Sequence, residues 1–141
     1  MLFVISRSIS QGIKGGAYSA LGIFLGCLVH IFGAVFGLSI IISKSAFLFD
    51  LIKFAGAGYL IYLGIKSLSA KAPVDNTPEN VMQAAPMTLL KQGIITNVLN
   101  PKVAIFFLSF LPQFIDPAAG QVQWQLLILG LWFAVQGTFV L

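Results

Sequence analysis

Long apolar stretches, separated by short polar ones, divide the chain into segments long enough to cross a membrane. No Asp, Glu, Lys or Arg occurs between Lys14 and Lys44, an interval longer than the roughly 20 residues that a helix needs to cross the hydrocarbon layer. The pattern predicts one transmembrane helix over residues 17–42 and a second over residues 47–68.

A polar, Pro-rich stretch interrupts this pattern near the middle of the chain. Its polar and helix-breaking residues include Lys71, Pro73, Asp75, Asn76, Pro78 and Glu79. Such a composition is typical of a loop. We therefore predict a linker over residues 70–91, between an N-terminal membrane half (residues 1–69) and a C-terminal membrane half (residues 92–141).

The C-terminal half predicts one broken span and one continuous span. Residues 92–115 contain a single charge, Lys102, directly after Asn100 and Pro101. Pro101 cannot continue a helix from the preceding turn, because proline lacks the N–H and clashes with the carbonyl four residues back. Proline suits the first position of a new helix, and asparagine is a favoured N-cap. The sequence thus predicts a half-helix that starts at Pro101, and a last span over residues 124–141.

The composition assigns the chain to the membrane-protein class. Of its 141 residues 58% are hydrophobic and 9% are charged, against about 25% charged in soluble domains, and the mean hydropathy is +0.97. A small soluble domain has a large surface relative to its volume, and twelve charged side chains are too few to cover that surface. One cysteine, Cys27, also excludes a disulfide scaffold. These features predict an all-α, multi-pass membrane protein.

The net charge of +4 does not indicate a nucleic-acid partner, because the eight basic residues are scattered. They are better explained as topology signals, which are enriched on the cytoplasmic side of membrane spans. Five of them lie before the first span or around the linker, namely Arg7, Lys14, Lys66, Lys71 and Lys91. This bias predicts a cytoplasmic linker.

Both ends of the chain have the pattern of incomplete membrane segments. Residues 1–9 are apolar but too short to span a bilayer, and Leu141 lies within a hydrophobic run. We expect that the chain lacks portions of a first and a last helix.

The break at Pro101 is the strongest candidate for a binding site. A helix that begins inside the membrane presents free N–H groups and the positive end of its dipole, and Lys102 adds a positive charge. In transporters such half-helix starts face substrate carboxylates. We expect a carboxylate to bind at Asn100, Pro101 and Lys102, with hydrogen bonds from Asn97. The alternative is a loop at the membrane surface, with Lys102 simply snorkelling.

The aromatic residues that follow the break have no predicted part in the binding site. The side chains of Phe106, Phe107 and Phe110 are expected to face lipid.

Four glycines of the first span lie on one helix face. Gly22, Gly26, Gly33 and Gly37 are spaced by 4, 7 and 4 residues, which places them on a common stripe. Small-residue stripes allow another helix to approach closely, within the chain or in a homodimer. His30 lies near the same face. It is either a proton-linked residue or a neutral histidine that is hydrogen-bonded across the helix interface.

The sequence offers no basis for catalysis, a metal or a cofactor. One histidine, one cysteine and four scattered acids cannot supply a zinc or calcium site. No nucleophile–base pair, phosphate-binding loop or dinucleotide pattern occurs. We therefore expect neither an enzyme nor a cofactor-binding protein.

Several stretches resemble the lysine exporter and homoserine/threonine-resistance (LysE/RhtB) translocators. They are RSISQGIKGG (7–16), KFAGAGYLIYLG (53–64), NVLNPK (97–102) and FLPQF (110–114). The resemblance covers essentially the whole chain apart from the Pro-rich linker.

The resemblance implies a bacterial inner-membrane exporter of amino acids or related small metabolites, driven by the proton gradient. Members of the family carry a Thr-Pro-Gly-Pro motif in their first helix, and this chain begins after it. With Asn100-Pro101, that motif would form paired broken helices in two inverted halves. Two alternatives stay open: a truncated remnant that only packs with other membrane proteins, and a metal-cation exporter, which would need intramembrane acids or a histidine cluster.

Overall fold

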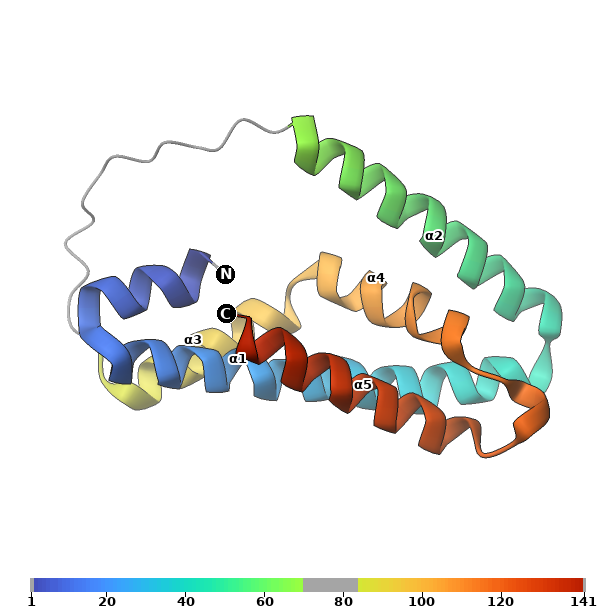
Figure 1. Cartoon of the computed structure of the whole chain (residues 1–141). Helices are drawn as coiled ribbons and strands as arrows, with labels where there is room; N and C mark the ends of the chain where they lie inside the picture. Colours follow the sequence, from blue (N-terminus) through green and yellow to red (C-terminus); the bar gives the residue numbers. More distant parts are fainter. Residues whose placement is uncertain (1, 70–83, 141) are drawn as a thin grey trace.

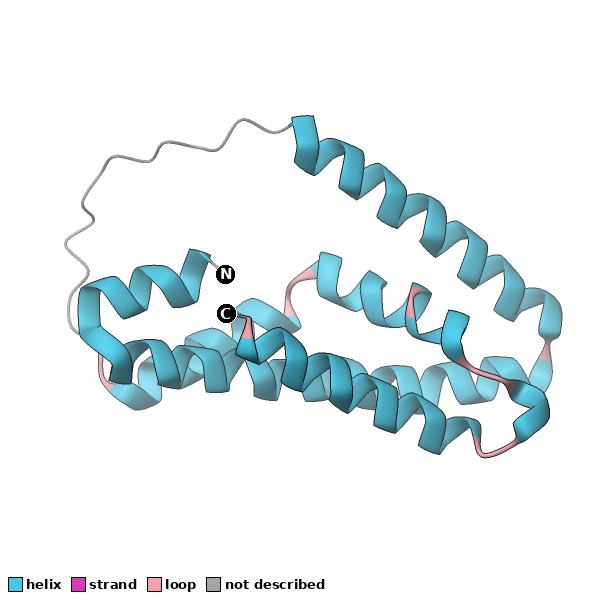
Figure 2. Ribbon diagram, in the orientation of Figure 1, coloured by secondary structure: helices cyan, strands magenta, loops and turns pink. Residues whose placement is uncertain are grey.

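The computed structural model describes residues 2–69 and 84–140, and these residues are helical without any strand (Figures 1 and 2). The elements are α1 (Leu2–Lys44), α2 (Ala46–Ser69), α3 (Pro86–Val98), α4 (Pro101–Ser109), the short 3-10 helices η1 (Leu111–Phe114) and η2 (Pro117–Ala119), and α5 (Val122–Phe139). Helices α1, α2 and α5 are long and apolar enough to span a bilayer, and α3 with α4 and η1 forms a bent pair that can supply a fourth span. The protein is an all-α, multi-pass membrane protein.

Helix α1 bends sharply at Gly12, earlier than the first predicted span. Gly12 has φ 70° and ψ −171°, a conformation that is essentially restricted to glycine. The segment before Gly12 folds back along the rest of α1. The two parts approach so closely that an ideal Cβ on Gly15 would lie 3.0 Å from the carbonyl oxygen of Arg7. The Arg7 guanidinium donates a 3.2 Å hydrogen bond to Gln92 of α3. The structure is thus helical from Leu2, with the bend at Gly12 between the short first segment and the part of α1 that contains the predicted span of residues 17–42.

Helix α1 lies at the centre of the molecule, with α3 and α5 packed along it (Figure 1). The side chains of Ile31 and Leu38 on α1 are fully buried, together with Leu111 of η1 and Leu126 of α5. Gly130 of α5 packs directly on Ile31, because a Cβ on this glycine would lie 2.9 Å from the isoleucine side chain. The apolar core thus holds α1, α5 and the end of the bent pair together.

Helix α2 diverges from this core and contacts it near one end (Figure 1). A Cβ on Gly56 would overlap the side chain of Ser109 on α4, so glycine permits the close crossing of these two helices. Beyond this crossing the apolar side chains of α2 are exposed, as Ile61 and Leu68 are.

The bent pair α3–α4 turns by 55° between Val98 and Pro101. Helix α3 begins at Pro86, so the last residues of the predicted linker, 86–91, are helical. Proline at the first helical position explains this start. Residues 70–83 of the predicted linker lie outside the described residues.

Candidate functional site

The predicted start of a helix at Pro101 is confirmed, and Asn100 is its N-cap. The Asn100 Oδ1 atom accepts a 3.1 Å hydrogen bond from the Lys102 N–H. The N–H groups of Val103 and Ala104 both donate to the Asn100 carbonyl, at 3.1 and 3.2 Å. The expectation of free N–H groups at the start of α4 is therefore wrong for this conformation. The N–H groups of the first turn donate to the side chain and the carbonyl of Asn100. The positive end of the α4 dipole remains.

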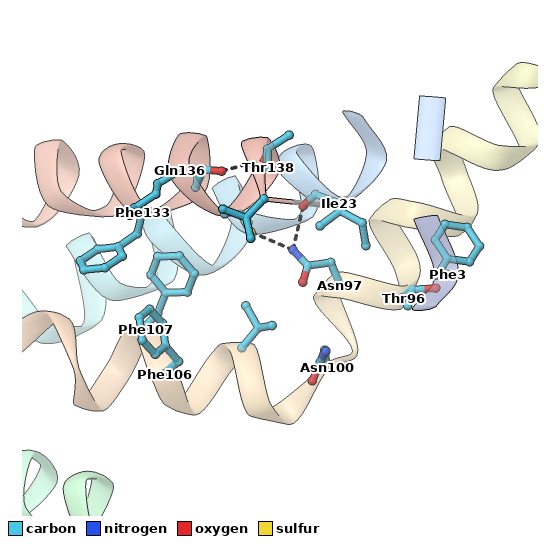
Figure 3. Close-up of a pocket in the computed structure, with 15 residues that line it drawn as sticks. Phe3, Ile23, Thr96, Asn97, Asn100, Phe106, Phe107, Phe133, Gln136 and Thr138 are labelled. Carbon is cyan, nitrogen blue, oxygen red and sulfur yellow. Dashed lines mark hydrogen bonds between the residues drawn. The ribbon is translucent and has the colours of Figure 1, made fainter. Parts of the chain in front are cut away.

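Asn97, in the last turn of α3, links this helix to α1. It is 3% exposed. Its Nδ2 atom donates to the carbonyl oxygen of Ile23 at 2.7 Å and to the Cys27 sulfur at 3.0 Å (Figure 3). Its Oδ1 atom makes no hydrogen bond to any described residue. Asn97 thus has a fixed orientation and one unused acceptor.

Two glycines of the predicted stripe set the distance between α1 and α3. A Cβ on Gly22 would clash with the carbonyl oxygen of Leu90 and lie 2.9 Å from Cα of Gly93. A Cβ on Gly26 would lie 2.7 Å from Cβ of Asn97. This close approach brings the Asn97 amide within reach of the α1 backbone.

The other two glycines of the stripe, Gly33 and Gly37, lie at exposed positions. A Cβ at either one would meet no atom within 4 Å. The described part of the chain therefore brings together one half of the stripe and leaves the other half on the surface.

His30 lies beside the break and contacts both of its helices. Its Nε2 atom is 3.0 Å from the carbonyl oxygen of Asn97, so Nε2 carries the proton and donates, since a carbonyl only accepts. Its ring stacks on Phe107 of α4, with the centroids 6.2 Å apart. His30 is thus hydrogen-bonded across a helix interface, at the C-terminal end of α3.

A cavity of about 580 Å³ opens at the break (Figure 3), a size within the ~300–1,000 Å³ range of small-molecule sites. Its lining comes from α1, the break, α4 and α5 and comprises Phe3, Ile23, Cys27, Thr96, Asn97, Asn100, Val103, Phe106, Phe107, Phe133, Ala134, Gln136, Gly137, Thr138 and Val140. None of these side chains is charged. The cavity therefore combines an apolar wall with a few amide and hydroxyl groups.

Two of the phenylalanines that were expected to face lipid line this cavity instead. Phe107 is 3% exposed. The Phe106 ring stacks on Phe110 with a centroid distance of 4.7 Å and meets the Phe133 ring edge-on at 5.6 Å. The expectation failed because His30 of α1 stacks on Phe107 and Phe133 of α5 packs on Phe106, contacts that the sequence of α4 alone does not reveal.

The structure places Pro101 and Lys102 at the break but outside the cavity lining. Both residues are exposed, on the first turn of α4. Of the predicted site residues, Asn97 and Asn100 are therefore the two that reach the cavity. His30 approaches it indirectly, through Asn97 and Phe107.

Several lining residues were not predicted from the sequence. Cys27, which the sequence analysis used only to exclude a disulfide scaffold, accepts a hydrogen bond from Asn97 at its sulfur and lines the cavity. Gln136 and Thr138 enter from α5. The uncharged amide of Gln136 within an apolar helix was a usable signal, since polar side chains inside membrane spans point to protein interfaces or cavities.

Comparison with known proteins gives a consistent family assignment. The family model described as LysE type translocator matches residues 1–140. An uncharacterized membrane protein of Bacillus subtilis, YrhP, is 38% identical over 136 residues, which cover 91% of this chain and 64% of the relative. Leucine efflux proteins of Salmonella choleraesuis and Salmonella typhi are each 35% identical over 118 residues, which cover 84% of this chain and 56% of the relative.

The chain thus spans about 64% and 56% of the lengths of these relatives. No solved structure gives a significant match. The helical membrane architecture, the broken helix at Asn100-Pro101 and the match over nearly every residue agree, and the chain belongs to the LysE type translocator family.

Proposed function

We propose that this protein exports an amino acid across the bacterial inner membrane. The observation that carries the proposal is the uncharged cavity at the break between α3 and α4, where Asn97 and Asn100 meet an aromatic wall. Such a cavity has polar groups for the amino-acid backbone and apolar surface for a side chain. The names of the Salmonella relatives, which are leucine efflux proteins, support an aliphatic substrate.

In this proposal the substrate carboxylate lies at the α4 N-terminus, near Asn100, Pro101 and Lys102. The dipole of α4 favours negative charge at this end. The Lys102 side chain lies outside the lining, so its contribution is the electrostatic potential that it adds. Asn97 supplies hydrogen bonds from the opposite side of the break.

We further propose that the proton gradient drives export and that His30 is linked to proton movement. The supporting observation is its position, between the Asn97 carbonyl and the Phe107 ring. A histidine donates from Nε2 in its cationic form and in one neutral form, so the contact with Asn97 can persist through a protonation cycle. The protonated form has a free Nδ1–H donor in addition.

Amino-acid efflux from cells loaded with leucine-containing dipeptides tests the proposal. Cells expressing the chain should accumulate external leucine faster than cells with an empty vector, and a protonophore should abolish the difference. Detection of the protein in the membrane fraction makes a negative result meaningful. Equal leucine efflux from both strains, with the protein present in the membrane, would contradict the proposal.

A further inference from the structure

The two asparagines of the cavity present opposite hydrogen-bonding groups. Asn97 must direct its nitrogen at the Ile23 carbonyl, because an amide oxygen there would face another acceptor. Asn100 must direct its oxygen at the Lys102 N–H, because that group is a donor. The remaining atoms are therefore the Asn97 Oδ1, an acceptor, and the Asn100 Nδ2, a donor.

Neither remaining atom makes a hydrogen bond to a described residue. In Figure 3 the Asn97 oxygen points away from Ile23, and Asn100 turns its nitrogen toward the side on which Asn97 lies. Asn97 is 3% exposed and lines the cavity. Because the described part of the chain offers this cavity-lining acceptor no donor, a ligand in the cavity can supply one.

We infer that these two amides recognise the two charged groups of a zwitterion, with the Asn97 Oδ1 accepting from the α-ammonium group and the Asn100 Nδ2 donating to the α-carboxylate. This inference rests on the proposed function and assigns its binding groups. It makes recognition depend on neutral amides, so the site carries no net charge and matches a ligand whose own charges cancel. Lys102 and the backbone N–H groups of α4 are not the direct partners of the carboxylate.

The inference requires both charged groups of the ligand. L-leucine, 4-methylpentanoate (which lacks the ammonium group) and 3-methylbutylamine (which lacks the carboxylate) share the same side chain and serve as probes. Binding is measured by titration calorimetry on the purified chain in lipid nanodiscs. We expect each analogue to bind at least tenfold more weakly than L-leucine.

Asn100→Asp is the sharpest variant for the carboxylate. Aspartate caps a helix as well as asparagine does and is favourable at the positive end of the dipole, so the fold is retained while the donor becomes an anion. We expect L-leucine to bind at least tenfold more weakly and 3-methylbutylamine to bind as well as before or better. Gln123→Glu, at an exposed position of α5, introduces the same charge away from the cavity and should change neither affinity.

Asn97→Ala tests the ammonium contact. If Asn97 accepts from the ammonium group, the variant loses affinity for L-leucine and not for 4-methylpentanoate. The tighter binding of L-leucine than of 4-methylpentanoate, which is expected for the wild type, then disappears. A merely structural role would weaken both ligands by the same factor, which would overturn the assignment.

The same preparations separate this inference from the proposed function. Binding with the expected analogue pattern but without leucine efflux from cells supports the inference and overturns export. Efflux by a wild-type protein whose Asn100→Asp variant binds L-leucine with unchanged affinity overturns the inference and leaves export standing. The absence of L-leucine binding to the wild type overturns the inference directly.

Discussion

Gly26 of α1 and Asn97 of α3 lie so close together that a Cβ on the glycine would sit 2.7 Å from the Cβ of the asparagine. This approach carries the Asn97 Nδ2 to the Ile23 carbonyl at 2.7 Å and to the Cys27 sulfur at 3.0 Å. The glycine stripe therefore serves the cavity as well as helix packing, because it determines where the asparagine amide lies.

Gly26→Ala should displace α3 and lower leucine efflux strongly. The added methyl group has no space, and such overpacking costs roughly 1–3 kcal/mol of folding free energy. Gly33→Ala is the matched control on the same helix, because a Cβ there meets nothing within 4 Å. The thermal unfolding temperature in detergent and the efflux rate should fall for Gly26→Ala alone. Equal behaviour of the two variants would show that the close contact is unimportant.

Gly12→Ala should destabilise the bend in α1. Its φ of 70° with ψ −171° is a region where other residues incur about 1–3 kcal/mol of strain. Gly58→Ala is the control: Gly58 is exposed and lies within α2, where alanine is favoured over glycine by roughly 0.5–1 kcal/mol. Unfolding temperatures should move in opposite directions. A neutral Gly12→Ala would indicate that the N-terminal segment takes another path.

His30→Gln separates a proton-linked role from a purely structural one. Glutamine retains an N–H donor for the Asn97 carbonyl, the group that His30 contacts at 3.0 Å, but it cannot exchange a proton in the physiological range. If His30 is proton-linked, the variant keeps its unfolding temperature while efflux driven by an imposed proton gradient falls. An efflux rate equal to that of the wild type would leave His30 a structural role.

Lys102→Ala should weaken substrate binding only modestly, because the Lys102 side chain lies outside the cavity lining. A charge near a helix terminus contributes typically 0.3–1 kcal/mol, which corresponds to a two- to fivefold loss in L-leucine affinity. Lys102→Arg keeps the charge and should bind like the wild type. A loss of a hundredfold or more in Lys102→Ala would mean that the ammonium group of this lysine contacts the carboxylate directly.

Ser19→Ala should raise the stability of the protein. The Ser19 side chain is fully buried, and its hydroxyl makes no hydrogen bond to a described residue. Removing an unpaired buried polar group recovers part of a penalty of roughly 1–3 kcal/mol. Ser39→Ala is the control, since the Ser39 hydroxyl donates to the Val35 carbonyl and no gain is expected. A lower unfolding temperature for Ser19→Ala would reveal a partner for the hydroxyl.

Much of the fold could be predicted from the chain alone, because a bilayer leaves few alternatives. An apolar stretch long enough to cross the hydrocarbon layer must form a helix. A helix is the only structure in which a single segment hydrogen-bonds all of its own backbone N–H and C=O groups away from water. The break at Asn100-Pro101 was equally local: the missing proline N–H and the capping asparagine determine it whatever surrounds them.

The sequence by itself therefore determined the membrane class, the order of the apolar helices and the break at Pro101, but not the bend of α1 at Gly12. Tertiary structure alone decided that Phe106 and Phe107 face a cavity, that Asn97 reaches Ile23 and Cys27, and that Lys102 stays outside. In an apolar chain almost every helix face is hydrophobic, so periodicity cannot distinguish a face that meets lipid from one that meets another helix. That choice depends on the fit of whole surfaces, which only the packed helices define.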